Sequence, residues 1–299
     1  GSYSYNALDA ILYGVPSTGY APWGVDGSII VYTTEVLGDL ATGEVTIIDT
    51  DKTFFVKSEG GNGATVSLSE LGLDIPTVTS VLIDGEEFTD FSVSNDAVIL
   101  TDAPRGNHEY TFIYGEEGYN VDGCVYDNGL STAEDVNSWR NGLAGYSVLL
   151  NNVDYEGATI GAGGYVTNQT LDGRGYKISN FIMTSNFVTR LYNNNAVVKN
   201  VYFDDVTQDC SAWSGAVDQG LFGNWHSGKI ENVYVNIKTI NMSGEHYGVL
   251  FYGTEPNAVV RNVVVEIESD CDKAHYVHMQ DAATDTVVEN LVGSGLNVG

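Results

Sequence analysis

The chain has 299 residues, of which 43% are hydrophobic, and this is enough for two or three domains with real cores. Its 40 acidic and 12 basic residues give a formal net charge of −28 at pH 7. This excess of negative charge excludes nucleic acid and anionic membrane surfaces as partners, since both require a positively charged footprint. It also disfavours polyuronates, unless a cation bridges the like charges.

The three cysteines, Cys124, Cys210 and Cys271, form neither a disulfide framework nor a zinc or redox pattern. No run of residues approaches the roughly 18 apolar residues of a membrane helix, so we expect no membrane insertion. The chain starts with Gly1-Ser2 and has no basic-then-apolar leader. If these two residues are an expression scar, a leader or an anchor could have been removed.

Residues 1–44 form an N-terminal segment in which tyrosine, tryptophan and proline are mixed with glycine. One interpretation is a surface that stacks against sugars or a partner. The alternative is an arm that wraps over the next domain.

Residues 45–125 are predicted to form a small β-sandwich. Short stretches with strand character are separated by Gly, Pro and Asp turns, as is typical of sandwiches. The strand-like stretches are residues 44–49, 53–57, 65–69, 78–83, 87–93, 98–100 and 108–114. Because no Cys-Trp-Cys pattern is present, the sandwich is Ig-like in architecture only. Such a module serves as a spacer or a partner surface.

A junction at residues 116–128 is followed by a predicted helix. Ser131 and Glu134 fit a capping box, in which the serine accepts an early backbone N–H and the glutamate reaches back. Val136, Trp139 and Leu143 then recur at helical spacing. A β-solenoid needs such a cap to cover its first coil.

Residues 126–299 repeat one unit, which is apolar, polar, Asn, apolar, any residue, apolar. Its asparagines are Asn180, Asn200, Asn232, Asn262 and Asn290, at steps of 20 to 32 residues. Such self-similarity indicates a solenoid, and the strand character of each unit makes it a β-solenoid. We expect all five asparagines to lie in register at one turn and to form an amide ladder.

The order of residues 146–154, then 170–180, then Gly220-Leu-Phe-Gly223 before residues 230–232 resembles the GLUG-type right-handed parallel β-helix. The resemblance implies an all-β chain with a single-stranded helix of the pectin-lyase-like architecture. It also implies an extracellular or cell-surface protein such as an adhesin, or a virion-surface fibre. Many such domains have no identified catalytic residues.

Two acidic clusters provide the only catalytic candidates, Asp204 and Asp205 in one and Glu266 and Glu268 in the other. A glycosidase uses paired carboxylates, whereas a lyase of this architecture holds Ca²⁺ with carboxylates and uses Arg or Lys as the base. No basic residue lies beside either cluster in a recognisable pattern, so a solvated surface is the simpler interpretation. Adjacent coils could still bring Lys238 or Lys199 close.

Other ligand candidates are weaker. His275 and His278 fall on opposite faces of a strand, so we expect no metal there and no cofactor beyond a possible Ca²⁺. Aromatic and histidine side chains in the longer loops are the binding candidates: Trp213, Trp225, His226, His246 and Tyr247. The alternative is that they pack under their own loops.

The leading functional prediction is a secreted or surface-displayed structural and recognition protein, which binds a glycan or a protein partner through its β-helix. The alternatives are a polysaccharide lyase or glycoside hydrolase, and a phage or cell-envelope fibre component. We expect little polysaccharide cleavage. Residues 286–292 still form a regular unit with no helix after it, so we also expect a longer natural chain or a partner subunit at that end.

Overall fold

The computed structural model describes residues 53–58, 63–69, 71, 78–212, 220–223, 225–242, 249–251, 253–267 and 287–294. The predicted N-terminal segment, residues 1–44, lies outside them. The chain divides into two compact units, one of Ile48–Gly129 with Gly145–Ser147, the other containing Leu130–Ala144 and Val148–Gly299. Within these described residues the fold is mostly β, with 59% of them in strands and one short helix, α2 (Ala133–Arg140).

The first unit contains two β-sheets that contribute to one core. The larger sheet has the spatial order β1 (Thr53–Lys57), β8 (Glu117–Tyr126), β7 (Gly106–Tyr114), β3 (Ser80–Ile83), β4 (Glu86–Phe88). The smaller sheet has the order β2 (Ala64–Ser67), β6 (Ala97–Leu100), β5 (Phe91–Ser94). Inward side chains alternate along these strands, and both sheets bury residues in one cluster that includes Val66, Val81, Leu100 and Phe112.

Two predicted boundaries in this unit are wrong. Residues 87–93 do not form one strand, because β4 and β5 belong to different sheets. The predicted junction at residues 116–128 is largely the strand β8, which pairs with β7 along its length. Gly123 lies in this strand because the Phe54 ring packs on it, and an added Cβ would come within 2.4 Å of that ring. A glycine inside a strand thus marks a close approach here, and not a linker.

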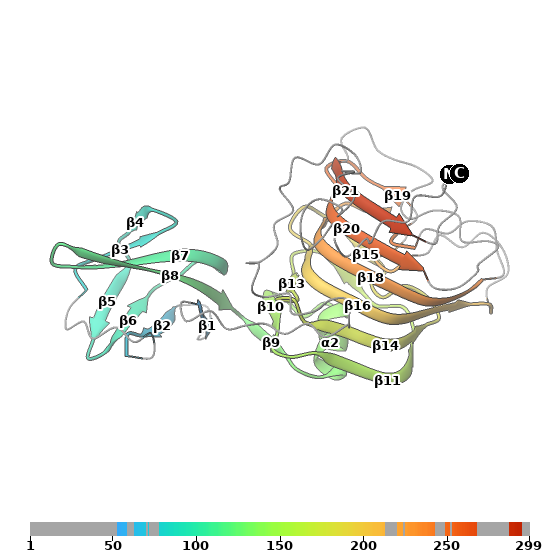
Figure 1. Cartoon of the computed structure of the whole chain (residues 1–299), viewed down its shortest axis with the longest axis horizontal. Coiled ribbons are helices and arrows are strands. Elements are labelled where there is room, and N and C mark those ends of the chain that lie inside the picture. Colours follow the sequence, from blue (N-terminus) through green and yellow to red (C-terminus); the bar gives the residue numbers. More distant parts are fainter. Residues whose placement is uncertain are drawn as a thin grey trace, which may run out of the picture. The chain divides into compact units, whose positions relative to one another are not determined.

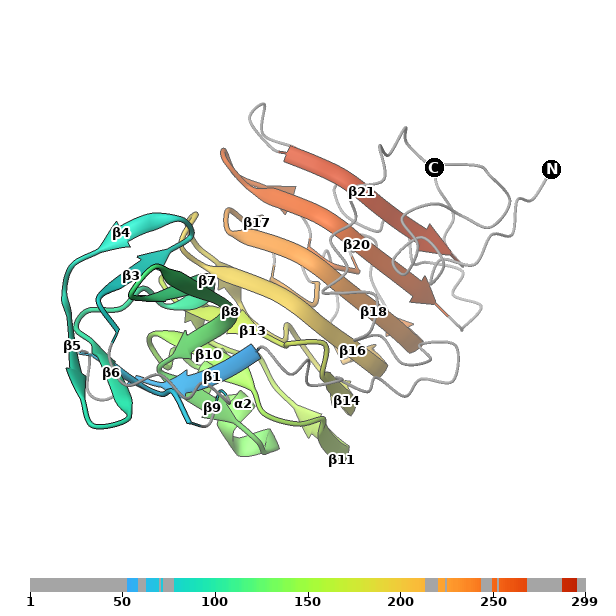
Figure 2. The ribbon, with the colours of Figure 1, turned by 60° about the vertical axis from the view of Figure 1, so that its left-hand side comes forward.

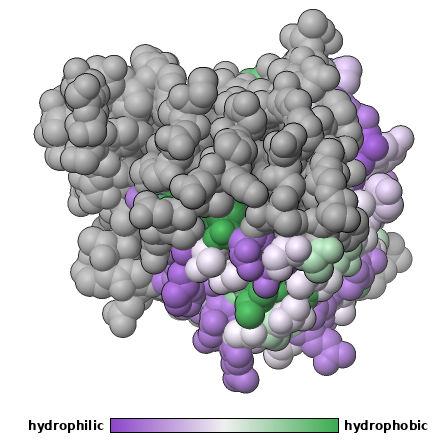
Figure 3. Space-filling view, turned by 90° about the vertical axis from the view of Figure 1, so that its right-hand side faces the viewer, coloured by the Kyte–Doolittle hydropathy of each residue, from purple (hydrophilic) through white to green (hydrophobic). Residues whose placement is uncertain are grey.

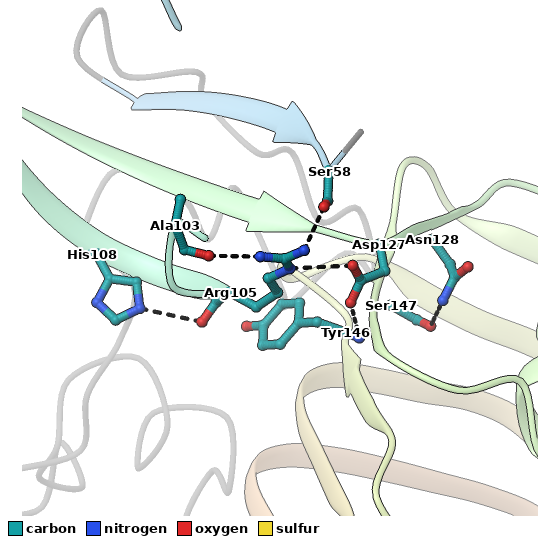
Figure 4. Close-up of polar contacts among 8 residues, drawn as sticks. All are labelled: Ser58, Ala103, Arg105, His108, Asp127, Asn128, Tyr146 and Ser147. Atoms are coloured by element: carbon teal, nitrogen blue, oxygen red, sulfur yellow. Dashed lines mark hydrogen bonds and ion pairs between the residues drawn. The ribbon is translucent and has the colours of Figure 1, made fainter. Parts of the chain in front are cut away.

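Arg105 joins three parts of the first unit (Figure 4). Its guanidinium donates to the Ala103 carbonyl at 2.7 Å, to Ser58 Oγ at 2.6 Å and to Asp127 Oδ1 at 3.2 Å. The other Asp127 oxygen accepts the backbone N–H of Tyr146 at 2.9 Å. The fixed fork of donors on arginine suits this set of separate acceptors, and the bonds attach residues 145–147 to the end of β8.

The second unit is a β-solenoid of about three turns. The longest sheet has the order β9 (Asn128–Leu130), β10 (Tyr146–Leu149), β13 (Thr170–Asp172), β16 (Val197–Cys210), β18 (Lys229–Met242), β20 (Val259–Ile267), β21 (Val287–Ser294), and its strands from β13 onward lie entirely in the second unit. Figures 1 and 2 both show β16, β18, β20 and β21 stacked side by side, and each of these neighbours pairs in parallel.

Three smaller pairings complete the coils. β11 (Val153–Ile160) pairs with β14 (Lys177–Met183), and β14 pairs on its other edge with β16. β12 (Tyr165–Val166) pairs with β15 (Arg190–Leu191), and β17 (Trp225–His226) pairs with β19 (Gly253–Thr254). All are parallel. Branched and aromatic side chains from successive coils stack inside and are fully buried, among them Val198, Ile230, Val260, Phe203, Val235 and Val265.

Asparagines bend the long strands. Asn200, Asn232 and Asn262 have φ values of 55°, 54° and 53°, in the left-handed region that asparagine tolerates better than most residues. They lie in register on β16, β18 and β20, and the register of β20 with β21 aligns Asn290 with Asn262. The predicted register is therefore confirmed for these four residues, and the amide ladder is confirmed for Asn200, Asn232 and Asn262.

Asn180 does not belong to that column, and its predicted register is wrong. The pairing of β14 with β16 places it opposite Asp205, and its amide donates to Asp154 Oδ1 at 3.0 Å. Asn180 and Asp205 have φ values of 58° and 50°, so they form a second column of left-handed bends. The repeated sequence unit marks such a bend in either column and does not tell the two apart.

The helix α2 has a capping box one residue later than predicted. Thr132, and not Ser131, is the N-cap; its hydroxyl accepts the Asp135 N–H at 3.2 Å. Asp135, in place of Glu134, reaches back to accept the N–H groups of Ser131 and Thr132 at 3.0 and 2.9 Å. One carboxylate therefore satisfies two backbone donors that precede the helix.

Candidate binding surface

The predicted carboxylates of β16 are held in ion pairs between coils. Asp204 Oδ2 lies 3.3 Å from Lys177 Nζ, and its Oδ1 accepts the Asn236 amide at 3.3 Å. Asp205, at a left-handed bend, lies 2.9 Å from Lys238 Nζ. Parallel coils bring Lys177 and Lys238 next to this cluster. Lys238 was one of the two lysines considered from the sequence, whereas Lys177 was not.

Lys199, the other lysine considered for this cluster, pairs elsewhere. Its ammonium lies 3.5 Å from Asp172 Oδ2, and the Asp172 side chain is fully buried. On the next two coils Glu231 pairs with Arg261 at 3.2 Å. The register of these strands thus places acidic and basic residues on alternate coils, which favours one alignment of the coils over slipped ones.

Glu266 accepts a hydrogen bond from the Tyr234 hydroxyl. The Tyr234 ring lies 4.3 Å from the Tyr202 ring, and Lys177 Nζ lies 4.7 Å from the centre of the Tyr202 ring. Burial raises the pKa of both tyrosines above the ordinary value, so both phenols stay neutral at physiological pH. We call Lys177, Tyr202, Asp204, Tyr234 and Glu266 the carboxylate strip.

The carboxylate strip is a closed network. Tyr202 and Tyr234 are 7% and 6% exposed, so they offer little surface to a polysaccharide. Their bonds and ring contacts connect β14, β16, β18 and β20, which stabilises the stacking of coils. Glu268, the remaining catalytic candidate, lies outside the described residues. The described part of the chain gathers no three metal-binding side chains at one place, and the His275 and His278 pair also lies outside it.

The predicted ligand-binding set has a different outcome for each member. Trp213, His246 and Tyr247 lie outside the described residues. Trp225 and His226 form β17 and are not in a loop. The His226 ring is fully buried and stacks on Phe251 with 4.9 Å between ring centres. Desolvation lowers the pKa of His226 to about 4, so this imidazole is a neutral core residue and does not face a ligand.

Two tyrosines that sequence reasoning missed lie on the surface of adjacent coils. Tyr165 in β12 is 61% exposed, and Tyr192, directly after β15, is 49% exposed. Their buried neighbours Val166 and Leu191 point into the core. The alternation of a strand therefore turns both tyrosines outward.

A charged pair lies between the two tyrosines. Arg190 is the register partner of Tyr165, and its guanidinium lies over the Tyr192 ring at 4.5 Å from the ring centre. The same guanidinium forms an ion pair with Glu255, which follows β19. A cation stacked on an aromatic face holds the ring in place, so Tyr192 presents a fixed platform.

Amide groups border the tyrosines. Asn168 Oδ1 accepts the side-chain N–H groups of Asn193 and Asn195 at 3.3 and 3.4 Å. Asn168 and Asn195 are exposed. We call Tyr165, Asn168, Arg190, Tyr192 and Glu255 the tyrosine surface. A stretch of one tyrosine and three asparagines, residues 192–195, was the signal in the sequence for this site.

Much of the surface formed by the described residues is polar. Figure 3 shows one face of the molecule, on which the described residues are mostly hydrophilic, with small hydrophobic groups between them. Scattered apolar groups are ordinary on a protein surface. The tyrosine surface differs because two large aromatic rings lie on neighbouring coils beside one ion pair.

Comparisons with known proteins leave the family open. No protein-family model matches the chain, and searches of curated proteins and of solved structures give no match either. The GLUG-type resemblance therefore stays a prediction. As expected from the sequence, the described residues include no helix with the length and apolar character needed to cross a membrane.

Proposed function

We propose that this protein is a secreted or surface-displayed recognition protein that binds a glycan through the tyrosine surface of its β-solenoid. The observation that carries the proposal is the pair of outward tyrosines on adjacent coils, 61% and 49% exposed. Aromatic rings offer large apolar faces at little entropic cost, and the C–H face of a sugar ring packs on such a face. A virion surface is an alternative location.

The finer architecture belongs to the same proposal. The solenoid would be a right-handed parallel β-helix of the GLUG type, and α2 would cap its first coil. Support for the cap comes from Val136 and Trp139 of α2, which are fully buried in the same cluster as the coil interior. The first unit, with two sheets and a shared core, would be an Ig-like module that acts as a spacer or partner surface.

Binding to an array of immobilised glycans tests the proposal. The variant Tyr165→Ala/Tyr192→Ala should lose at least about tenfold in affinity for any glycan that wild type binds, which corresponds to about 1.4 kcal/mol. Tyr119→Ala is the matched control, because Tyr119 is 38% exposed but lies on β8 of the first unit. Glycan binding that survives the double variant, or no binding by wild type, would contradict the proposal.

A polysaccharide-cleaving enzyme remains the second candidate, because the carboxylate strip places a lysine, two phenols and two carboxylates together. The burial of both phenols opposes it. Incubation with pectate and alginate should release no unsaturated or reducing sugars. Release that Asp204→Asn abolishes would favour the enzyme over a recognition protein.

A further inference from the structure

We infer that the ligand of the tyrosine surface is an uncharged glycan with at least two sugar rings. This inference rests on the proposed function and adds the chemical class and the minimum length of the ligand. It follows from the charge, the hydrogen-bonding groups and the spacing of the residues that form the surface.

The surface offers an anion no unneutralised cation among its described residues. Arg190 is its only basic member, and the guanidinium is already paired with the Glu255 carboxylate. The chain as a whole carries a net charge of −28, so a polyuronate or a sulfated glycan would approach against a repulsive field. A neutral glycan meets no such barrier.

The polar groups of the surface suit hydroxyls. An amide presents both a donor and an acceptor, as a sugar hydroxyl does. The Asn168 carbonyl oxygen is occupied by the amides of Asn193 and Asn195. The side-chain N–H groups of Asn168 have no partner among the described residues, whereas its backbone N–H donates to Gln169 Oε1, and Asn168 is exposed. Asn168 is therefore placed to donate to a hydroxyl or ring oxygen beside the tyrosines.

The spacing of the tyrosines sets the length. Tyr165 pairs with Arg190, and Tyr192 lies two residues after Arg190, directly after the adjacent strand β15. With parallel strands about 4.8 Å apart and a rise of about 3.3 Å per residue, the Cα atoms of such diagonal neighbours lie about 8 Å apart, which is too far for one pyranose ring to lie face-on against both side chains. Two linked rings are required, and they would lie diagonally across two coils.

Affinity electrophoresis of the whole chain tests the charge of the ligand. Gels contain galactomannan, β-glucan or dextran as neutral polymers, and polygalacturonate or alginate as polyuronates. At least one neutral polymer should retard wild type, and the retardation should change less than about twofold between 0.02 M and 0.5 M salt, since screening affects only charge pairs. Polyuronate retardation that depends on the tyrosines and weakens with salt would overturn the inference.

The variant Glu255→Gln provides a gain-of-binding test, because it leaves Arg190 without its carboxylate partner. We expect this variant to acquire retardation by polygalacturonate that wild type lacks, and to lose it at high salt. Glu117→Gln, in the first unit, is the matched control and should acquire none. Equal polyuronate binding by wild type and Glu255→Gln would show that Arg190 is already available to anions.

Oligomers of the retained neutral sugar test the length. Disaccharides and trisaccharides should compete at least about tenfold better than the monosaccharide, and equal competition would contradict the two-ring requirement. These outcomes separate the two claims. Binding of no glycan, or binding that ignores Tyr165→Ala/Tyr192→Ala, contradicts the proposed function itself, whereas tyrosine-dependent polyuronate binding contradicts only the inference about charge.

Discussion

Asp172 Oδ1 accepts the side-chain N–H of Asn200 at 2.9 Å, and this bond begins a ladder of amides through the solenoid. Asn232 donates to Asn200 at 3.0 Å, and Asn262 donates to Asn232 at 2.9 Å. All donors point toward the earlier coil. The first member must therefore be an acceptor, and the Asp172 carboxylate supplies it without adding a donor that needs a partner of its own.

The first prediction concerns the two roles of Asn232. It adopts a left-handed φ, and its side chain donates one hydrogen bond of the ladder and accepts another. Asn232→Leu removes both and should lower the free energy of unfolding by about 1–3 kcal/mol for the broken hydrogen bonds, with further loss from backbone strain. Asn232→Gly keeps the φ at no steric cost and should lose less. Urea unfolding measures both.

Asn241→Leu is the matched control for these variants. It is an exposed asparagine on the same strand, and its replacement should change stability by less than about 0.5 kcal/mol. If both Asn232 variants unfold like wild type, the amide ladder contributes nothing to stability.

The second prediction concerns the buried Asp172 carboxylate and its partner Lys199, 3.5 Å away. Lys199→Met should cost about 1–3 kcal/mol, because it leaves a buried negative charge without its cation. Asp172→Asn in the same chain should recover part of this loss, since it removes the charge and keeps an acceptor for Asn200. If the double variant loses more free energy of unfolding than the two single variants lose together, the pairing of Lys199 with Asp172 does not have this role.

The third prediction is a pH dependence set by His226. Its pKa of about 4 in the folded protein lies below the ordinary 6.5 because burial disfavours the charged ring. The unfolded chain therefore binds more protons between these values. The stability that the neutral His226 ring contributes to the free energy of unfolding is fully present above pH 6.5. It decreases as the pH falls from 6.5 toward 4, by about 3 kcal/mol in total.

Urea unfolding of wild type and of His226→Phe at pH 7.5 and pH 4.5 tests this prediction. Phenylalanine keeps the stacking on Phe251 and cannot titrate. Carboxylates contribute acid sensitivity to both proteins, so the difference between them isolates the histidine. Equal losses of stability in the two proteins would show that His226 is not neutral and buried.

The fourth prediction concerns Arg140 of α2, whose side chain is almost fully buried. It donates to the carbonyl oxygens of Phe187 and Gly161 and lies over the Phe187 ring, at 5.3 Å from the ring centre. Arg140→Lys should lower the melting temperature although it keeps the positive charge, because an ammonium cannot reproduce the planar fork of donors or the stacking on the ring. A melting temperature of Arg140→Lys within about 1 °C of wild type would oppose this role.

The sequence was sufficient to predict the repeating coils but not the surface. Asparagines at left-handed bends recur because few other residues accept that φ, so Asn200, Asn232 and Asn262 were placed correctly. Asn180 was misplaced because the same local pattern serves a second column of bends. Tyr165 and Tyr192 were missed because one lies on the short strand β12 and the other directly after the short strand β15, and only the pairing of these strands brings them together.

Hydrogen–deuterium exchange of the whole chain, with and without the neutral polysaccharide that retards it most, is the most direct test of the central claim. We expect slower exchange in the backbone amides of residues 163–168 and 189–195 on binding, with no change in residues 202–206 and 234–237. Protection of the second pair of segments alone would place the ligand on the carboxylate strip and contradict a glycan site at Tyr165 and Tyr192.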